Sequence, residues 1–344
     1  MIEIICSDEL YTYNVYHITK AFFPSEKVEQ SVERTCADAV RVTLPDGTVL
    51  LAERAADRCA DRQERKRCVD REIYTGLEQY TGRSLAWGLL TGVRPSKIAM
   101  KELEGGAQME EFLRSFQEQY FVSGEKAKLA WEIAGREKAL LEQLDYEDGY
   151  SLYVGIPFCP SVCTYCSFSS GALEAWKDRV EDYLDALMKE LAYIGKVSAG
   201  KKLNTVYIGG GTPTTLTACQ LERLLDCIDS NFSREHLLEY TVEAGRPDSI
   251  TKEKLSVLYR HRITRISINP QSMQQKTLDL IGRRHTVEDI VRTYALAREN
   301  GFDNINMDLI MGLPEEDMDD VRHTLHEVKK LAPDSLTVHS LAIK

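Results

Sequence analysis

Three cysteines lie close together near the middle of the sequence, at Cys159, Cys163 and Cys166. Their spacing is C-x3-C-x2-C, and they follow a short apolar segment that ends at Pro157. Cysteine thiolates are the usual protein ligands of iron–sulfur clusters, and a four-iron cube needs four ligands. Three neighbouring cysteines therefore predict a [4Fe–4S] cluster with one iron open to an exogenous ligand. The alternatives are a zinc site that lacks its fourth ligand, or three unrelated thiols.

Alternating strands and helices are predicted around these cysteines. The strands are expected at 151–156, 204–209, 238–244, 263–269, 304–310 and 335–341, and the helices near 173–198, 217–231, 251–260, 274–281, 286–300 and 318–331. Repeated strand–helix units predict an α/β fold with a parallel sheet, closed or partly closed as a barrel. Active sites of such barrels lie where the strands end. The cysteines follow the first strand, Gly209-Gly-Gly-Thr212 the second and Glu243 ends the third, so we expect them to form one site.

The residues around the cysteines resemble one enzyme family. The pattern Tyr153-x-x-Ile-Pro-Phe-Cys-x3-Cys-x-Tyr-Cys is similar to that of radical S-adenosylmethionine (SAM) enzymes, specifically the oxygen-independent coproporphyrinogen III oxidase family. This family includes a heme-chaperone branch and a HemZ-type branch, and the long segment before the motif favours the HemZ type. The resemblance runs from about Tyr150 to the end of the chain. It implies a partial (β/α)6 barrel, a [4Fe–4S] cluster held by Cys159, Cys163 and Cys166, and SAM.

The same resemblance implies a set of SAM contacts. Tyr165 matches an aromatic residue beside the adenine, and the glycine-rich loop matches one that meets the amino-acid end of SAM. Glu243 matches a carboxylate close to SAM, and His285 matches a position of the heme-chaperone branch. The full set of expected cofactor contacts is Tyr153, Tyr165, Gly210, Gly211, Thr212, Glu243, Gln271, Arg283, Asp308 and, through its backbone, Ala342.

For the reaction, the resemblance implies reductive cleavage of SAM to methionine and a 5′-deoxyadenosyl radical. In the oxidase this radical takes a hydrogen atom from propionate side chains of coproporphyrinogen III, which become vinyl groups. A flavodoxin- or ferredoxin-like partner would supply the electrons. Phe168 stands where the oxidases usually carry a further cysteine, so heme binding on the same scaffold and a different substrate remain alternatives. Arg246 and Arg284 are candidates for pairing with propionates.

Composition excludes several other classes of protein. The 344 residues carry a net charge of −11, and both halves of the sequence are acidic, which argues against nucleic-acid binding. There is no run of eighteen apolar residues and no basic segment at the N-terminus, so we expect neither a membrane span nor secretion. Nine cysteines without a signal peptide predict a reducing, cytoplasmic location.

Residues 1–145 are predicted to form a separate α+β and helical domain of unknown role, before a radical SAM domain at 150–344. A strand is expected at 1–6, a helix at 9–22, a hairpin around Pro45-Asp-Gly47, a long helix at 58–80 and further helices over 96–144. Arg94 and Pro95 are expected to start a helix. The sequence ends directly after the sixth predicted strand, so we expect the family's C-terminal region to be missing.

Overall fold

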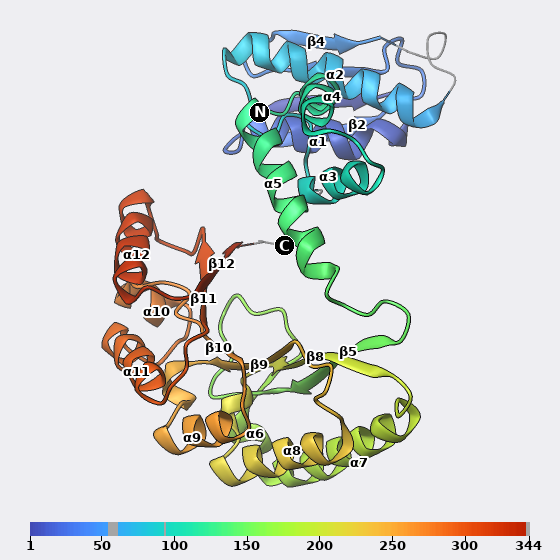
Figure 1. Ribbon diagram of the computed structural model, residues 1–344. Coiled ribbons are helices and arrows are strands. Elements are labelled where there is room, and N and C mark those ends of the chain that lie inside the picture. The colour runs from blue at the N-terminus through green and yellow to red at the C-terminus, as the bar shows by residue number, and fades with distance from the viewer. Residues whose placement is uncertain (54–60, 93, 342–344) are drawn as a thin grey trace. The chain divides into compact units, whose positions relative to one another are not determined.

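The computed structural model describes residues 1–53, 61–92 and 94–341 (Figure 1). The chain divides into two compact units, Met1–Gln143 and Leu144–Lys344. Each unit has a hydrophobic core made of its own residues. None of the helices within the described residues is both long enough and apolar enough to span a membrane.

The first unit begins with a mixed four-stranded sheet covered by helices. Its elements are β1 (Ile2–Cys6), α1 (Glu9–Phe22), β2 (Val28–Val32), β3 (Val40–Thr43), β4 (Val49–Ala52) and α2 (Arg62–Thr81), and the strand order is β2-β1-β3-β4. The predicted first strand, first helix and hairpin are confirmed. The sequence reading missed β2, whose side chains are mostly polar and exposed at the edge of the sheet. The long helix begins at Arg62, and the predicted start at residue 58 lies outside the described residues.

Three further helices complete the first unit: α3 (Pro95–Glu104), α4 (Met109–Tyr120) and α5 (Gly124–Leu141). Pro95 occupies the first helical position of α3, directly after an extended Arg94, as predicted. The Phe112 and Phe116 rings of α4 stack with their centroids 4.7 Å apart. They belong to the same buried cluster as the small alanine side chains of α5, which permit close helix packing.

The second unit is built on a parallel sheet of six strands that curls into a half-barrel (Figure 1). The strands are β5 (Gly149–Ile156), β8 (Lys202–Gly210), β9 (Glu239–Gly245), β10 (Arg265–Ile268), β11 (Ile305–Met311) and β12 (Ser335–Ser340). They pair in chain order, each one parallel to the next. This confirms the predicted α/β partial barrel, with all six strands close to their expected positions.

Helices follow the strands and cover the outside of the sheet (Figure 1). They are α6 (Leu173–Trp176), α7 (Val180–Val197), α8 (Ala218–Asn231), α9 (Lys252–Arg260), α10 (Gln275–Leu280), α11 (Val287–Glu299) and α12 (Met318–Leu331). Capping boxes at Thr217, Thr286 and Asp317 satisfy free backbone N–H groups and fix where α8, α11 and α12 begin. The helix predicted over 173–198 is interrupted by a 3-10 turn at Lys177–Arg179.

The two faces of the six-stranded sheet differ in chemistry. Successive side chains of a strand point to opposite faces. The residues facing the helices, such as Ile208, Val242 and Ile266, are fully buried in the core. The alternate residues, such as Tyr207 and Glu243, are polar and line a cavity on the inner face. The core therefore lies between sheet and helices, and the inner face is free for a polar site.

Candidate active site

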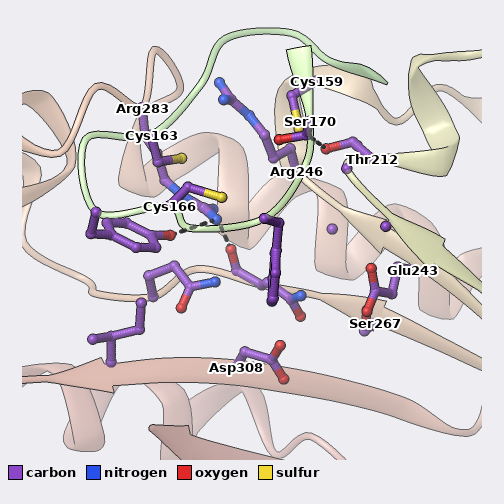
Figure 2. A pocket seen from close by; sticks show the side chains of 18 of the residues that line it. Cys159, Cys163, Cys166, Ser170, Thr212, Glu243, Arg246, Ser267, Arg283 and Asp308 are labelled. Atoms are coloured by element: carbon purple, nitrogen blue, oxygen red, sulfur yellow. Dashed lines mark hydrogen bonds between the residues drawn. The ribbon is translucent and has the colours of Figure 1, made fainter. Parts of the chain in front are cut away.

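The three cysteines line one cavity of about 490 Å³ at the inner face of the half-barrel. The loop that carries them begins directly after β5, with Cys159 in the two-residue strand β6 (Phe158–Cys159). All three cysteines are free and partly buried. Figure 2 shows Cys163 and Cys166 on one side of the cavity and Cys159 beside Thr212 on the other. The Thr212 hydroxyl donates to the Cys159 sulfur at 3.5 Å.

Backbone hydrogen bonds give the cysteine loop a defined shape. The N–H of Cys166 donates to the carbonyl of Cys163 at 3.1 Å, which closes a tight turn. The N–H of Thr164 donates to the carbonyl of Ile281 at 3.1 Å and ties this turn to the segment after α10. The loop is therefore ordered by the protein itself.

The glycine-rich loop after β8 packs directly against the cysteine loop. The N–H of Thr212 donates to the carbonyl of Phe158 at 2.7 Å. A Cβ atom on Gly211 would lie 2.7 Å from that carbonyl and 3.0 Å from the Cys159 sulfur, so only glycine fits there. Gly210 has φ +108°, a conformation that side chains disfavour. Gly210, Gly211 and Thr212 all line the cavity with the thiols, as the sequence predicted.

Two carboxylates, Glu243 at the end of β9 and Asp308 in β11, project from the sheet toward the same cavity (Figure 2). Burial raises the pKa of Glu243, and the negative charge of Asp308 raises it further. The Tyr207 hydroxyl donates a hydrogen bond to Glu243, which opposes this rise. The Asn306 side chain donates to Asp308 at 2.7 Å. Both carboxylates are thus oriented by neutral donors, and their remaining lone pairs can accept hydrogen bonds from a ligand.

Gln271 and Arg283 form another wall of the cavity. Gln271 has φ +67°, and its backbone bridges to β11 by exchanging hydrogen bonds with Asp308 and Ile310. A non-glycine residue in this conformation is unusual and typical of functional sites. Arg283 donates to the Asn269 carbonyl and, at 3.5 Å, to the Tyr165 hydroxyl. Burial raises the pKa of Tyr165 to about 12, so its hydroxyl stays protonated.

Several buried polar atoms of this cavity have no hydrogen-bond partner within the described residues. They are Ser170 Oγ, Ser267 Oγ, Asn269 Oδ1, Gln271 Oε1 and Arg283 Nε. An unsatisfied buried donor or acceptor costs about 1–3 kcal/mol, and a bound polar ligand removes this cost. SAM carries an amine, a carboxylate, hydroxyls and ring nitrogens that match such groups. The cavity therefore fits a polar molecule of this kind.

The thiols fit a cluster rather than a single ion. Within the parts of the chain that are described, no three His, Cys, Asp or Glu side chains converge closely enough to hold one metal ion. The ligands of a four-iron cube bind different iron atoms and do not need to meet at one point. Three free thiols around one cavity satisfy that requirement.

One expected contact, Tyr153, is not part of the thiol cavity's lining. Tyr153 is 62 % exposed and lines an adjoining cavity of about 330 Å³, which shares Tyr207, Gly210 and Glu243 with the thiol cavity. Its ring stacks on that of Tyr207, with centroids 5.9 Å apart. Ala342 lies outside the described residues.

The two arginines considered for propionate binding differ in position: Arg246 lines the cavity and Arg284 does not. The Arg246 guanidinium forms an ion pair with Asp248 and donates to Ser161. Arg284 is exposed and is absent from the cavity lining. Pairing of either arginine with a propionate stays a prediction.

Sequence reasoning missed several polar residues that line the cavity, including these four: Tyr207, Ser267, Asn269 and Asn306. Each lies two positions from a residue that was noticed or from another of the four, as expected for one face of a strand. The alternation of polar and apolar residues along β8, β10 and β11 was the available signal.

Comparison with known proteins places the chain in a family. Residues 153–328 match the Radical SAM superfamily. The oxygen-independent coproporphyrinogen-III oxidase-like protein HemZ of Bacillus subtilis is 44 % identical over 272 residues, which are 78 % of this chain and 54 % of that protein. The heme chaperone HemW of Bacillus subtilis is 35 % identical over 195 residues, covering 56 % of this chain and 51 % of the chaperone.

One solved structure resembles the chain clearly. It is the coproporphyrinogen III oxidase HemN of Escherichia coli, described as a radical SAM enzyme, with a TM-score of 0.53 and 31 % identity over 60 % of this chain and 47 % of that one. The chain spans about half the length of the curated relatives it matches. Superfamily members use a [4Fe–4S] cluster and SAM. The chain is a member of the radical SAM superfamily and, within it, of the coproporphyrinogen III oxidase-like family.

Proposed function

We propose that this protein catalyses the oxygen-independent oxidative decarboxylation of coproporphyrinogen III to protoporphyrinogen IX. The observation that carries the proposal is the convergence of three cysteine thiols and the strand-end polar groups on one cavity. The similarity to HemZ and to the Escherichia coli oxidase supports the choice of substrate.

In this proposal Cys159, Cys163 and Cys166 would bind three irons of the cluster, which would leave the fourth iron open to SAM. The glycine-rich loop would meet the amino-acid end of SAM. Gly211 lets this loop pack against the cysteine loop, because a Cβ there would meet the Phe158 carbonyl and the Cys159 sulfur. Glu243 and Asp308 accept hydrogen bonds from the amine or the ribose hydroxyls. When bound, the cluster and SAM supply one-electron chemistry that can remove a hydrogen atom from an unactivated carbon.

Each of two propionate side chains would give a hydrogen atom to the SAM-derived fragment, release CO2 and pass one electron to a one-electron acceptor, which leaves a vinyl group. The reducing electrons would come from a flavodoxin- or ferredoxin-like protein, and we place the reaction in the reducing cytoplasm. The walls of the cavity orient the reacting groups and exclude water, which is the protein's part in cofactor chemistry.

The test is an anaerobic assay. Protein reconstituted with iron and sulfide is given dithionite and SAM, with and without coproporphyrinogen III, and 5′-deoxyadenosine and porphyrin are measured by chromatography. Nucleoside that rises in proportion to porphyrinogen consumed supports the proposal. SAM cleavage that ignores added porphyrinogen rejects the substrate.

A second candidate function is heme binding on the same scaffold. It is favoured by Phe168, a 74 % exposed apolar side chain at the cavity where the oxidases usually carry a further cysteine, and by the similarity to heme chaperones. Heme titration distinguishes the two functions. A sharp Soret band at one equivalent without porphyrinogen turnover would favour the chaperone.

A further inference from the structure

A buried arginine reaches the cysteine loop from the end of β9. The side chain of Arg246 is 3 % exposed. Its Nη1 donates to the Ser161 carbonyl at 2.9 Å and to the Ser161 hydroxyl at 2.8 Å. Ser161 is the central residue of the three that separate Cys159 from Cys163. The arginine therefore holds the part of the loop that sets the spacing of these two thiols.

The other nitrogens of Arg246 bind Asp248. Nε donates to Oδ1 at 3.0 Å and Nη2 donates to Oδ2 at 2.7 Å, which is the bidentate geometry that orients a guanidinium most rigidly. His285, fully buried, also lies near this carboxylate, with Nδ1 3.7 Å from Oδ1. Burial opposes ionisation of Asp248, but the contacts with His285 and Arg246 hold its pKa well below the usual value.

The backbone of Arg246 is itself fixed. Its N–H donates to the Ala244 carbonyl at 2.7 Å, and its carbonyl accepts from the N–H and the hydroxyl of Ser249 at 3.0 and 2.7 Å. Lys254 donates to the Ser249 carbonyl at 2.9 Å. On the loop side, the Ser161 hydroxyl donates to the Gly282 carbonyl at 3.0 Å. The arginine thus joins a rigid strand end to the cysteine loop (Figure 2).

Burying the Arg246–Asp248 ion pair beside the cysteine loop costs free energy, because both charges lose contact with water. Such a pair is therefore expected to have a role that offsets this cost. We infer that Arg246, oriented by Asp248, is a positioning residue that fixes the C-x3-C segment for cluster binding. The inference rests on the proposed assignment of the three thiols as cluster ligands. Cysteine ligands on a loop that is already ordered bind a cluster without the entropic cost of ordering that loop. Loss of the arginine therefore lowers the affinity for the cluster without removing any ligand.

Hydrogen exchange on the protein without cluster tests the positioning directly. Arg246→Lys keeps the charge but not the planar fork. The double variant Arg246→Met/Asp248→Asn removes the pair together, so that no carboxylate stays buried without its partner. In both variants we expect the hydrogen-bonded amides of Thr164 and Cys166 to exchange about ten- to a hundredfold faster. The amides of α8 should exchange at the rate of the parent protein. The exposed Arg284→Ala is the matched control and exchanges like the parent protein.

The spectrum of the cluster gives a second readout. After anaerobic reconstitution and reduction, electron paramagnetic resonance is recorded with and without SAM. We expect the variants to bind fewer irons per chain and to need about tenfold more SAM for the spectral change. Loop exchange and spectra equal to those of the parent, or faster exchange throughout the unit, would overturn the inference. If the thiols are not the ligands, the parent itself gains no cluster, which separates the two failures.

Discussion

Two carboxyl groups have a pKa raised by burial: Asp70 in the first unit, which is buried, and Glu243 in the second, which is partly buried. Burial is the largest cause of the raised pKa of each, and each accepts a hydrogen bond from a neutral donor. Asp70 lies in α2 and is 5 % exposed, and its Oδ1 has no hydrogen-bond partner among the described residues. Glu243 opens onto the thiol cavity.

The difference teaches how to interpret a buried polar group. Around Glu243 the unsatisfied atoms gather on one cavity, where a ligand can satisfy them all. The Asp70 carboxyl accepts a hydrogen bond from Asn14, and burial still raises its pKa to about 6, so its ionisation lowers stability at neutral pH. A perturbed pKa points to function when it coincides with a cavity and a set of convergent groups.

The largest effect is expected from removing a ligand of the proposed cluster. Cys163→Ser should leave less iron and sulfide bound and reduce formation of 5′-deoxyadenosine by about a thousandfold or more, because a hydroxyl is a poor ligand for iron in a cluster. Cys219→Ser is the control, since Cys219 is exposed on α8 and is not part of the cavity lining. Normal SAM cleavage by Cys163→Ser would contradict the assignment of the cavity beside Glu243 as the cluster and SAM site.

A smaller but still severe effect is expected at the glycine-rich loop. In Gly211→Ala the new Cβ would lie 3.0 Å from the Cys159 sulfur and closer still to a backbone oxygen. The two loops must move apart, and we expect SAM cleavage to fall about ten- to a hundredfold, which corresponds to about 1.4–2.8 kcal/mol of transition-state stabilisation. Gly200→Ala, where the Cβ meets nothing within 4 Å, should match the parent. Equal rates for both variants would contradict the proposed role of the loop.

The sequence was sufficient for those features whose signal is local. The six strands and the helices between them follow from apolar periodicity, and the thiol site follows from the spacing of three cysteines. The polar edge strand β2 was not predicted, because it buries almost no apolar side chain and so shows no apolar periodicity.

The remaining parts of the site depend on contacts between distant segments. Arg246 meets Ser161 across 85 positions of the sequence, and Gln271 takes up its φ of +67° where it bridges to β11. No local pattern encodes such pairings, and an arginine at a strand end looks the same whether it faces a ligand or a neighbouring loop. The role of Arg246 could therefore be assigned only from its contacts.

The carboxyl group of the first unit predicts a change in stability with a definite pH dependence. The pKa of Asp70 is raised from 3.8 to about 6 in the folded protein, so ionisation destabilises the fold as the pH rises from about 4 to about 6. Asp70→Asn removes this effect. We expect a gain on the order of 2–3 kcal/mol at pH 7 and none at pH 3.5.

Hydrogen exchange of the α1 and α2 amides in the full chain measures this gain locally. Glu104→Gln, at an exposed position of α3, is the control and should change nothing. A gain that persists unchanged at pH 3.5 would show that ionisation of Asp70 is not its cause.

The smallest effect is expected from removing the neutral hydrogen-bond donor of each carboxyl group, which is Tyr207 for Glu243 and Asn14 for Asp70. Tyr207→Phe deletes the hydrogen bond that lowers the pKa of Glu243, so this pKa should rise further. A protonated Glu243 is a poorer acceptor for a cationic amine, and a hydrogen bond of this kind contributes about 1 kcal/mol. We expect SAM affinity to fall about three- to tenfold, with a larger loss at pH 6 than at pH 8, as measured by equilibrium dialysis.

Asn14→Ala is the matched change at Asp70 and should lower the stability of the first unit without altering SAM affinity. An equal loss of SAM affinity in both variants, or a loss independent of pH, would contradict the proposal that Glu243 binds SAM and Asp70 does not.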